Sequence, residues 1–296
     1  MPPLFVPAPG ERPAPAAAGC AGQCDLGADL RVLHDTLTAG RPAAMHAPAD
    51  PDARASYRWR IGHHVSVVLW QLMSGELIRA LAMQESDDNA IELTVGWYDL
   101  YSVVLLYTGS CSASRYGATV RADMAAWNPA LSGEWAADHR PLPGLVHEIL
   151  QSRPSACTAP LRAAVHDNQH IHAAVAARLV PDGVSLLQEA GRQPGATPDP
   201  LETAAFDAYF AVRRSPVCDV GLRAQLVRRL VQVVCDLVGH GLHDVDERWL
   251  TEEGQDSLVE KFSSLLLELL CHHIEHLAAQ EVVPGCGPFR QRREST

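Results

Sequence analysis

Three histidines stand within seven residues of one another in the segment HDNQHIHAAVAARLV, residues 166–180. An imidazole can bind a metal ion or transfer a proton near neutral pH, so each of them is a candidate ligand or catalyst. On a helix, His172 shares a face with Leu161, Val175 and Leu179, which predicts that it points into the core. Small alanines surround it, so the helix surface there is low enough for a flat ligand to approach.

His166 and His170 have the spacing i, i+4, which would allow them to bridge a divalent metal. Their face carries mostly alanines and Asp167, and no third ligand is evident nearby. We therefore expect both side chains on the solvated surface.

A second histidine cluster spells H-x-x-E-H with His272, Glu275 and His276, the motif of the inverted zinc peptidases. That motif requires a further carboxylate ligand downstream, and only Glu281 and Glu294 remain to supply it. Metal-assisted hydrolysis is therefore the weaker hypothesis for this chain, although the spacing suits it.

Helical periodicity dominates the chain after about residue 25, and no internal repeat occurs. On the first long helix, His64 falls on the apolar stripe with Ile61 and Val68, while His63 is turned away by about 100°. The sequence predicts an all-α fold, with a flexible Pro/Ala-rich tail over residues 1–25 and a single helical domain over residues 26–296. The expected helices are 57–83, 90–107, a short one after Ser112, 145–151, 159–179, 200–212, 221–238 and 255–282, with an ordered loop over 124–143.

Composition limits the partners of this 296-residue chain, of which 47% is hydrophobic and whose formal net charge is −11. Such a charge argues against nucleic acids and anionic membranes. The eight cysteines lack Cys-x-x-Cys spacing, no signal peptide is recognisable, and no apolar stretch is expected to span a bilayer. We therefore expect reduced thiols and a cytoplasmic protein, with a homo-oligomer left open.

The most specific motif follows the second long helix and has the form G-S-C-x4-Y-x4-R-x2-M. A second motif, SGEWAADHRP, runs from Ser132 to Pro141. Together with His64 and His172, these residues resemble the haem-dependent L-tyrosine hydroxylases of bacterial natural-product pathways, which are structural relatives of tryptophan 2,3-dioxygenase. The residues of the first motif are Gly109, Ser110, Cys111, Tyr116, Arg121 and Met124.

The resemblance implies an all-α domain that holds haem b, with hydrogen peroxide as oxidant and L-tyrosine as substrate, hydroxylated at ring position 3 to L-DOPA. It also implies His172 as the iron ligand and His64 as the catalytic acid/base. No cysteine lies four residues after a histidine, so we expect the haem to be non-covalent. Trp135 and Ser132 are expected at the haem, and Arg121, Arg115, Tyr116 and Ser110 at the substrate.

For Arg121, pairing with a haem propionate or with a surface acid is an equal alternative to binding the substrate carboxylate. Two alternatives also remain for the whole chain. One is a related haem enzyme acting on tryptophan or a methylated tyrosine, and the other is a haem-binding sensor or carrier without turnover.

Overall fold

Helices form almost all of the regular structure in the computed structural model, which describes residues 2–14, 26–42, 47–82, 88–242, 271 and 274. The predicted all-α class is confirmed. The helices are α1 (Leu26–Ala39), α2 (Pro51–Ala82), α3 (Asp88–Thr108), α4 (Ala113–Tyr116), α5 (Ala122–Trp127), α6 (Leu142–Ser152), α7 (Ser155–Leu179), α8 (Leu186–Glu189), α9 (Pro200–Tyr209) and α10 (Asp219–His240), joined by a π-helical turn η2 (Gly117–Arg121) and a 3-10 turn η3 (Gly133–Trp135).

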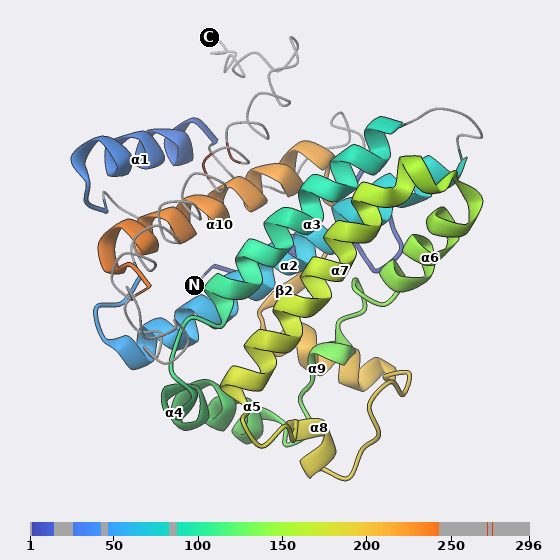
Figure 1. Cartoon of the computed structure of the whole chain (residues 1–296). Helices are drawn as coiled ribbons and strands as arrows, with labels where there is room; N and C mark the ends of the chain where they lie inside the picture. The colour runs from blue at the N-terminus through green and yellow to red at the C-terminus, as the bar shows by residue number, and fades with distance from the viewer. Residues whose placement is uncertain are drawn as a thin grey trace, which may run out of the picture.

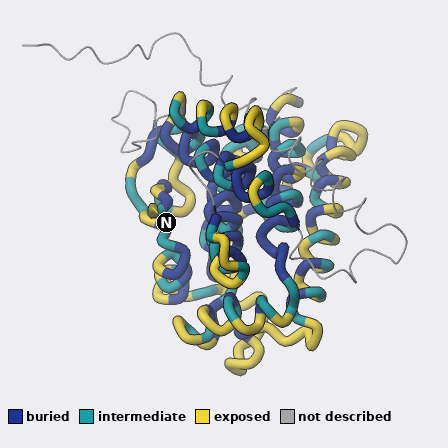
Figure 2. Tube along the Cα trace, turned by 90° about the vertical axis from the view of Figure 1, so that its left-hand side faces the viewer, coloured by how far each residue is buried: buried dark blue, intermediate teal, exposed yellow. Residues whose placement is uncertain are grey.

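The central element is α2, which packs against α3, α6 and α10 (Figure 1). Its 32 residues include a long run of buried apolar side chains, from Val65 to Met73. By length and composition alone this helix could cross a membrane, contrary to the expectation that no stretch would. In the structure α2 is a core helix, with the other helices arranged around it and the exposed residues on the outside (Figure 2).

Two glycines allow helices to pack closely: Gly62 where α2 meets α3, and Gly109 where the end of α3 meets α7. A Cβ added at Gly62 would lie 1.7 Å from the Thr108 hydroxyl oxygen, so only glycine fits between the two helices there. A Cβ at Gly109 would lie 2.5 Å from the Val175 side chain of α7. The Arg178 guanidinium also donates to the carbonyls of Gly109 and Cys111, which ties the end of α7 to the end of α3.

The structure differs from the expected flexible tail at the N-terminus. Strand β1 (Leu4–Val6) pairs in parallel with β2 (Val212–Arg214), and Leu4 and Val6 are fully buried. The side-chain amide of Gln225 on α10 accepts from the Phe5 N–H and donates to the Phe5 carbonyl, each at 2.8 Å. Residues 4–6 are therefore part of the folded structure, and residues 15–25 of the expected tail lie outside the described residues.

The predicted helix 200–212 is shorter in the structure. It begins well, because Asp199 and Glu202 form a capping box around Pro200. It ends at Tyr209, and Ala211 then adopts a positive φ of 53°, which turns the chain into β2. The apolar pattern does not predict this change of direction. Alanine rarely adopts a positive φ, so its presence at position 211 gives no signal for a turn.

Two further expectations change. The segment 124–143 contains the end of α5, η3 and the start of α6 rather than only a loop. Cys218, expected as a reduced thiol, is disulfide-bonded, while Cys111, Cys157, Cys235 and Cys271 form no disulfide bond. The predicted helix 255–282 lies outside the described residues, apart from Cys271 and Ile274.

Candidate active site

Two adjacent histidines on α2 have different environments. His64 is fully buried, as its position on the apolar stripe predicts, and its Nε2 donates to the carbonyl of Phe210 at 2.5 Å. Because a carbonyl can only accept, the proton lies on Nε2 and the buried Nδ1 is left without a partner among the described residues. Burial lowers the pKa of His64 to about 3. His64 is therefore a neutral core residue in this structure.

His63 is turned the other way and is only half-buried. Its Nδ1 lies 2.7 Å from the Trp59 carbonyl and must donate to it, which leaves the Nε2 lone pair available as a base. Its ring stacks on Phe210 at a centroid distance of 4.1 Å and packs against Trp59 at 4.5 Å. Burial first, and then the electrostatic effect of His172, lower the pKa of His63 to about 4.

His172 interrupts the buried stripe of α7. Asn168, Val175 and Leu179 on that stripe are buried, whereas His172 is exposed, contrary to the expectation that it points into the core. The protein around it nonetheless lowers its pKa by desolvation. The two observations agree if the imidazole of His172 is partly surrounded by protein and still reaches solvent, at a position that no other described element covers.

A third histidine that the sequence analysis did not single out joins this group. His139 follows η3 and is half-buried, with its ring edge-on to Trp70 at 5.1 Å. Its pKa is lowered by burial and, second, by the electrostatic effect of His172. His139 lies within the SGEWAADHRP motif, so the signal was present, but its role could not be inferred from spacing. The electrostatic effect of His172 therefore reaches both His63 and His139, whereas the fully buried His64 is affected only by His63 among these three histidines.

The residues around His172 fit a haem. Iron binds a neutral imidazole, and desolvation keeps all three of these imidazoles neutral. His172 is accessible on the otherwise buried face of α7, as a ligand to a flat group requires. Among the described residues no three His, Cys, Asp or Glu side chains could hold a metal ion together, so these histidines do not form a chelating site there.

The two arginines expected at the substrate carboxylate are both engaged elsewhere. Arg121, at the end of η2, pairs with Glu189 at 2.8 Å and donates to the Val184 carbonyl. This is the surface-acid alternative that the sequence left open. Arg115 pairs with Asp52 at 2.9 Å across the α2–α4 contact. As placed, neither guanidinium is directed at the group of histidines.

The remaining predicted substrate residues are buried. Tyr116 packs against Trp59 at 5.4 Å, beside His63, and burial raises its pKa to about 12. The Trp59 ring therefore contacts both Tyr116 and His63. Ser110 is buried, accepts from Arg58 and donates to the Tyr107 carbonyl. Ser110 is a structural residue in this arrangement.

The two residues expected at the haem lie at η3. Trp135 is buried in the core, and Ser132 caps η3 by accepting from the Glu134 N–H at 3.2 Å. They shape the turn that leads to His139. The zinc-peptidase motif of His272, Glu275 and His276 lies outside the described residues.

Comparison with family models supports the resemblance of this all-α chain to a haem-dependent tyrosine-hydroxylase-like family. Residues 26–160 match the model described as SfmD 3-methyl-L-tyrosine peroxygenase. The matched segment is less than half of the chain. A search of curated proteins found no match.

The matched segment contains most of the site but not all of it. It includes His63, His64 and His139 and ends within α7, before His172. The match supports a haem peroxygenase, an oxidoreductase that acts on an aromatic amino acid with peroxide. The identity of the iron ligand is not covered by it.

Proposed function

We propose that this chain is a haem-dependent monooxygenase that uses hydrogen peroxide to hydroxylate the phenol ring of L-tyrosine at position 3. The observation that carries the proposal is His172, an accessible and neutral imidazole on the otherwise buried face of α7, whose electrostatic effect reaches His63 and His139. The match to a peroxygenase family supports the choice of oxidant and substrate class.

In this proposal His172 binds the iron of a non-covalent haem b, and the bound haem supplies the oxidising chemistry. His63 replaces His64 as the residue that moves protons. Its Nδ1 donates to the Trp59 carbonyl, and its ring is fixed between Trp59 and Phe210. The orientation of Nε2 is therefore already set before a substrate binds. A pKa of about 4 makes the neutral form available to accept a proton from peroxide and return it to the departing oxygen.

Tyr116 and Trp59 supply an aromatic wall beside His63, against which a phenol ring can pack. The substrate carboxylate requires a cation. Arg121 can serve only by leaving Glu189, an exposed partner whose loss costs little because surface ion pairs contribute about 0–1 kcal/mol.

Spectra and products of the purified holoprotein test this proposal. We expect the haem absorption band to respond to L-tyrosine and not to L-tryptophan, and peroxide to convert L-tyrosine to a product heavier by one oxygen atom. 3-Methyl-L-tyrosine is the decisive competitor, because the matched family model is named for it. Exclusive turnover of the methylated substrate would correct the substrate, and haem binding without any hydroxylation would favour a carrier.

A further inference from the structure

A row of aromatic rings leads from His63 to the surface of the protein. His63 stacks on Phe210 at a centroid distance of 4.1 Å, and Phe210 meets the Tyr209 ring edge-on at 4.8 Å. The Tyr209 ring lies 6.2 Å from that of Trp127, the last residue of α5. These centroid distances are those of neighbouring rings in or near contact. The four rings therefore form one continuous path from α2 through the end of α9 to α5.

The two outer rings of this path differ in their exposure to solvent. Tyr209 is only 5% exposed, whereas Trp127 is 55% exposed. Among the tryptophans and tyrosines that the structure describes, Trp127 is the only exposed one, and the others are buried or half-buried. A soluble molecule therefore reaches the path at Trp127.

The four rings also differ in how easily they are oxidised. Indole and phenol rings are electron-rich and lose one electron far more readily than the rings of phenylalanine and histidine. Tyr209 and Trp127 can therefore hold an oxidised state, while Phe210 and His63 act only as a bridge between Tyr209 and the site. Phe210 directly follows Tyr209 in the chain, so this bridge is covalent as well as stacked.

Oxidation of Tyr209 requires a proton acceptor, and the structure supplies one. The Tyr209 hydroxyl donates to Asp123 Oδ2 at 3.0 Å, and Arg60 donates to the same oxygen at 3.1 Å. The Arg60 guanidinium also lies over the Tyr209 ring, 5.2 Å from its centroid. A cation at this position destabilises a positively charged ring, so Tyr209 must give its proton to Asp123 when it loses an electron.

We propose that Trp127 and Tyr209 conduct electrons from soluble one-electron donors to the site at His63, which gives the protein a second, peroxidase-type activity at its surface. This inference rests on the proposed function, because the electron acceptor is the haem after its oxidation by peroxide.

Each electron transfer balances along the path. Tyr209 gives an electron inward and its proton to Asp123, and Trp127 then reduces Tyr209, which recovers that proton. The donor in solution reduces the oxidised Trp127. Two such electrons, together with two protons from solution, convert one hydrogen peroxide into two waters and leave two donor molecules oxidised.

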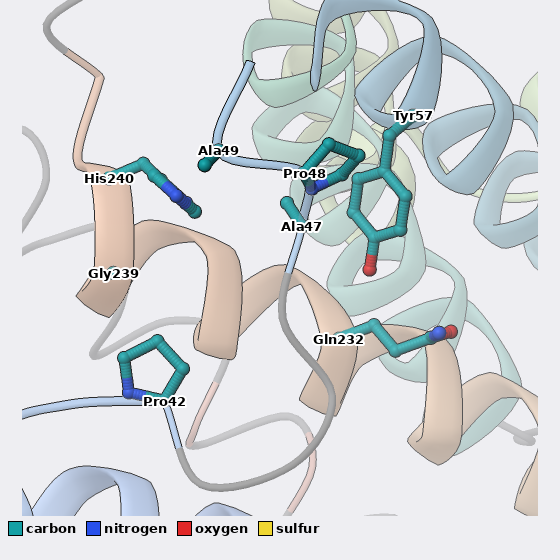
Figure 3. A pocket seen from close by; sticks show the side chains of 8 residues that line it. All are labelled: Pro42, Ala47, Pro48, Ala49, Tyr57, Gln232, Gly239 and His240. Atoms are coloured by element: carbon teal, nitrogen blue, oxygen red, sulfur yellow. The ribbon is translucent and has the colours of Figure 1, made fainter. Parts of the chain in front are cut away.

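Ferrocyanide is the donor with which the holoprotein tests this activity, in the presence of peroxide and without an amino acid. We expect two ferricyanide ions per peroxide consumed. Trp127→Phe and Tyr209→Phe should lose most of this oxidation but still hydroxylate L-tyrosine. Tyr57→Phe is the matched control, because Tyr57 also lies beside the bundle core but lines the pocket next to α10, away from the path (Figure 3). Unchanged ferrocyanide oxidation in Trp127→Phe would overturn the inference.

A spectroscopic measurement tests the path without using peroxide. A photogenerated ruthenium(III) tris-bipyridine complex oxidises exposed tryptophan, and the radical is then trapped by freezing for electron paramagnetic resonance. Ring-deuterated tyrosine in the protein narrows the signal of a tyrosyl radical. We expect this signal in the unmodified chain and its loss in both Trp127→Phe and Tyr209→Phe, whereas a signal that persists in both variants would contradict the path.

The two assays separate the inference from the proposed function. A holoprotein that hydroxylates L-tyrosine but does not oxidise ferrocyanide would overturn the inference alone. A protein without bound haem would fail in both reactions with peroxide, which would overturn the proposed function as well.

Discussion

The imidazole of His172 is the residue on which the proposed chemistry depends. Replacement by alanine removes the proposed bond between protein and iron and leaves only packing to hold the haem. We expect His172→Ala to lose most of its haem, measured by absorbance and iron content. Because the side chain is exposed, the fold should persist by circular dichroism, so full haem retention with an unchanged spectrum would reject the ligand assignment.

His63 and His64 are expected to separate activity from stability. His63→Gln should retain haem and slow peroxide-dependent turnover by about 10²–10⁴, the usual contribution of a general acid/base. His64→Ala should instead lower the free energy of unfolding by about 2–4 kcal/mol, because it leaves a cavity and an unpaired Phe210 carbonyl. Single-turnover kinetics and urea unfolding of both variants test this. Slow turnover in His64→Ala with normal turnover in His63→Gln would instead support His64 as the acid/base, as predicted from the sequence.

Acid sensitivity follows from the pKa of buried His64. Its pKa is about 3 when folded and about 6.5 when unfolded. Between these values the unfolded chain binds the proton first, so stability falls as the pH decreases below about 6.5. His64→Gln keeps a donor for the Phe210 carbonyl but does not titrate. We expect it to flatten the decline in Tm between pH 7 and 5 relative to the exposed control His166→Gln, and an equal slope in the two variants would contradict the assignment.

The corner between α9 and β2 positions both histidines of α2. Phe210 stacks on His63 with its ring and accepts from His64 with its carbonyl, and the next residue, Ala211, has a φ of 53°. An L-residue in this region is strained by about 1–2 kcal/mol. Ala211→Gly removes that strain at some entropic cost, so we expect a gain of about 0.5–1 kcal/mol in urea unfolding. Ala208→Gly, within α9, should destabilise instead, and a loss of stability in Ala211→Gly would show that the corner is unstrained.

Helix positions were predictable because the apolar period and the capping residues are local signals. The predicted helix 159–179 ends where α7 ends and starts four residues after it, and the buried stripe of α2 correctly includes His64. Burial on the apolar stripe, however, does not by itself show which of the two adjacent histidines of α2 acts in the site. His63 is held between Phe210 and Trp59, and His172 is exposed because no other described element covers it. Both facts depend on contacts between segments distant in sequence, which periodicity does not contain.

At the scale of the whole molecule, metal content distinguishes the haem hypothesis from the zinc-peptidase motif of His272, Glu275 and His276. We expect the tag-free protein to contain about one iron per chain and little zinc, because the motif lacks an evident third ligand. Elemental analysis of the unmodified chain and of a His272→Ala, His276→Ala double variant measures this. One zinc per chain that disappears in the double variant, together with hydrolytic activity, would overturn the haem assignment.

The pairing of β1 with β2 has a consequence for how the chain is made. Leu4 is opposite Val212, so this strand has no partner until the chain has been synthesised as far as Val212. Contacts this distant in sequence close late, since the loop entropy is lost before the contact forms. The strand that ends at Val6 therefore joins a helical core that is already assembled. During synthesis, Leu4 and Val6 are an exposed apolar segment, available to chaperones.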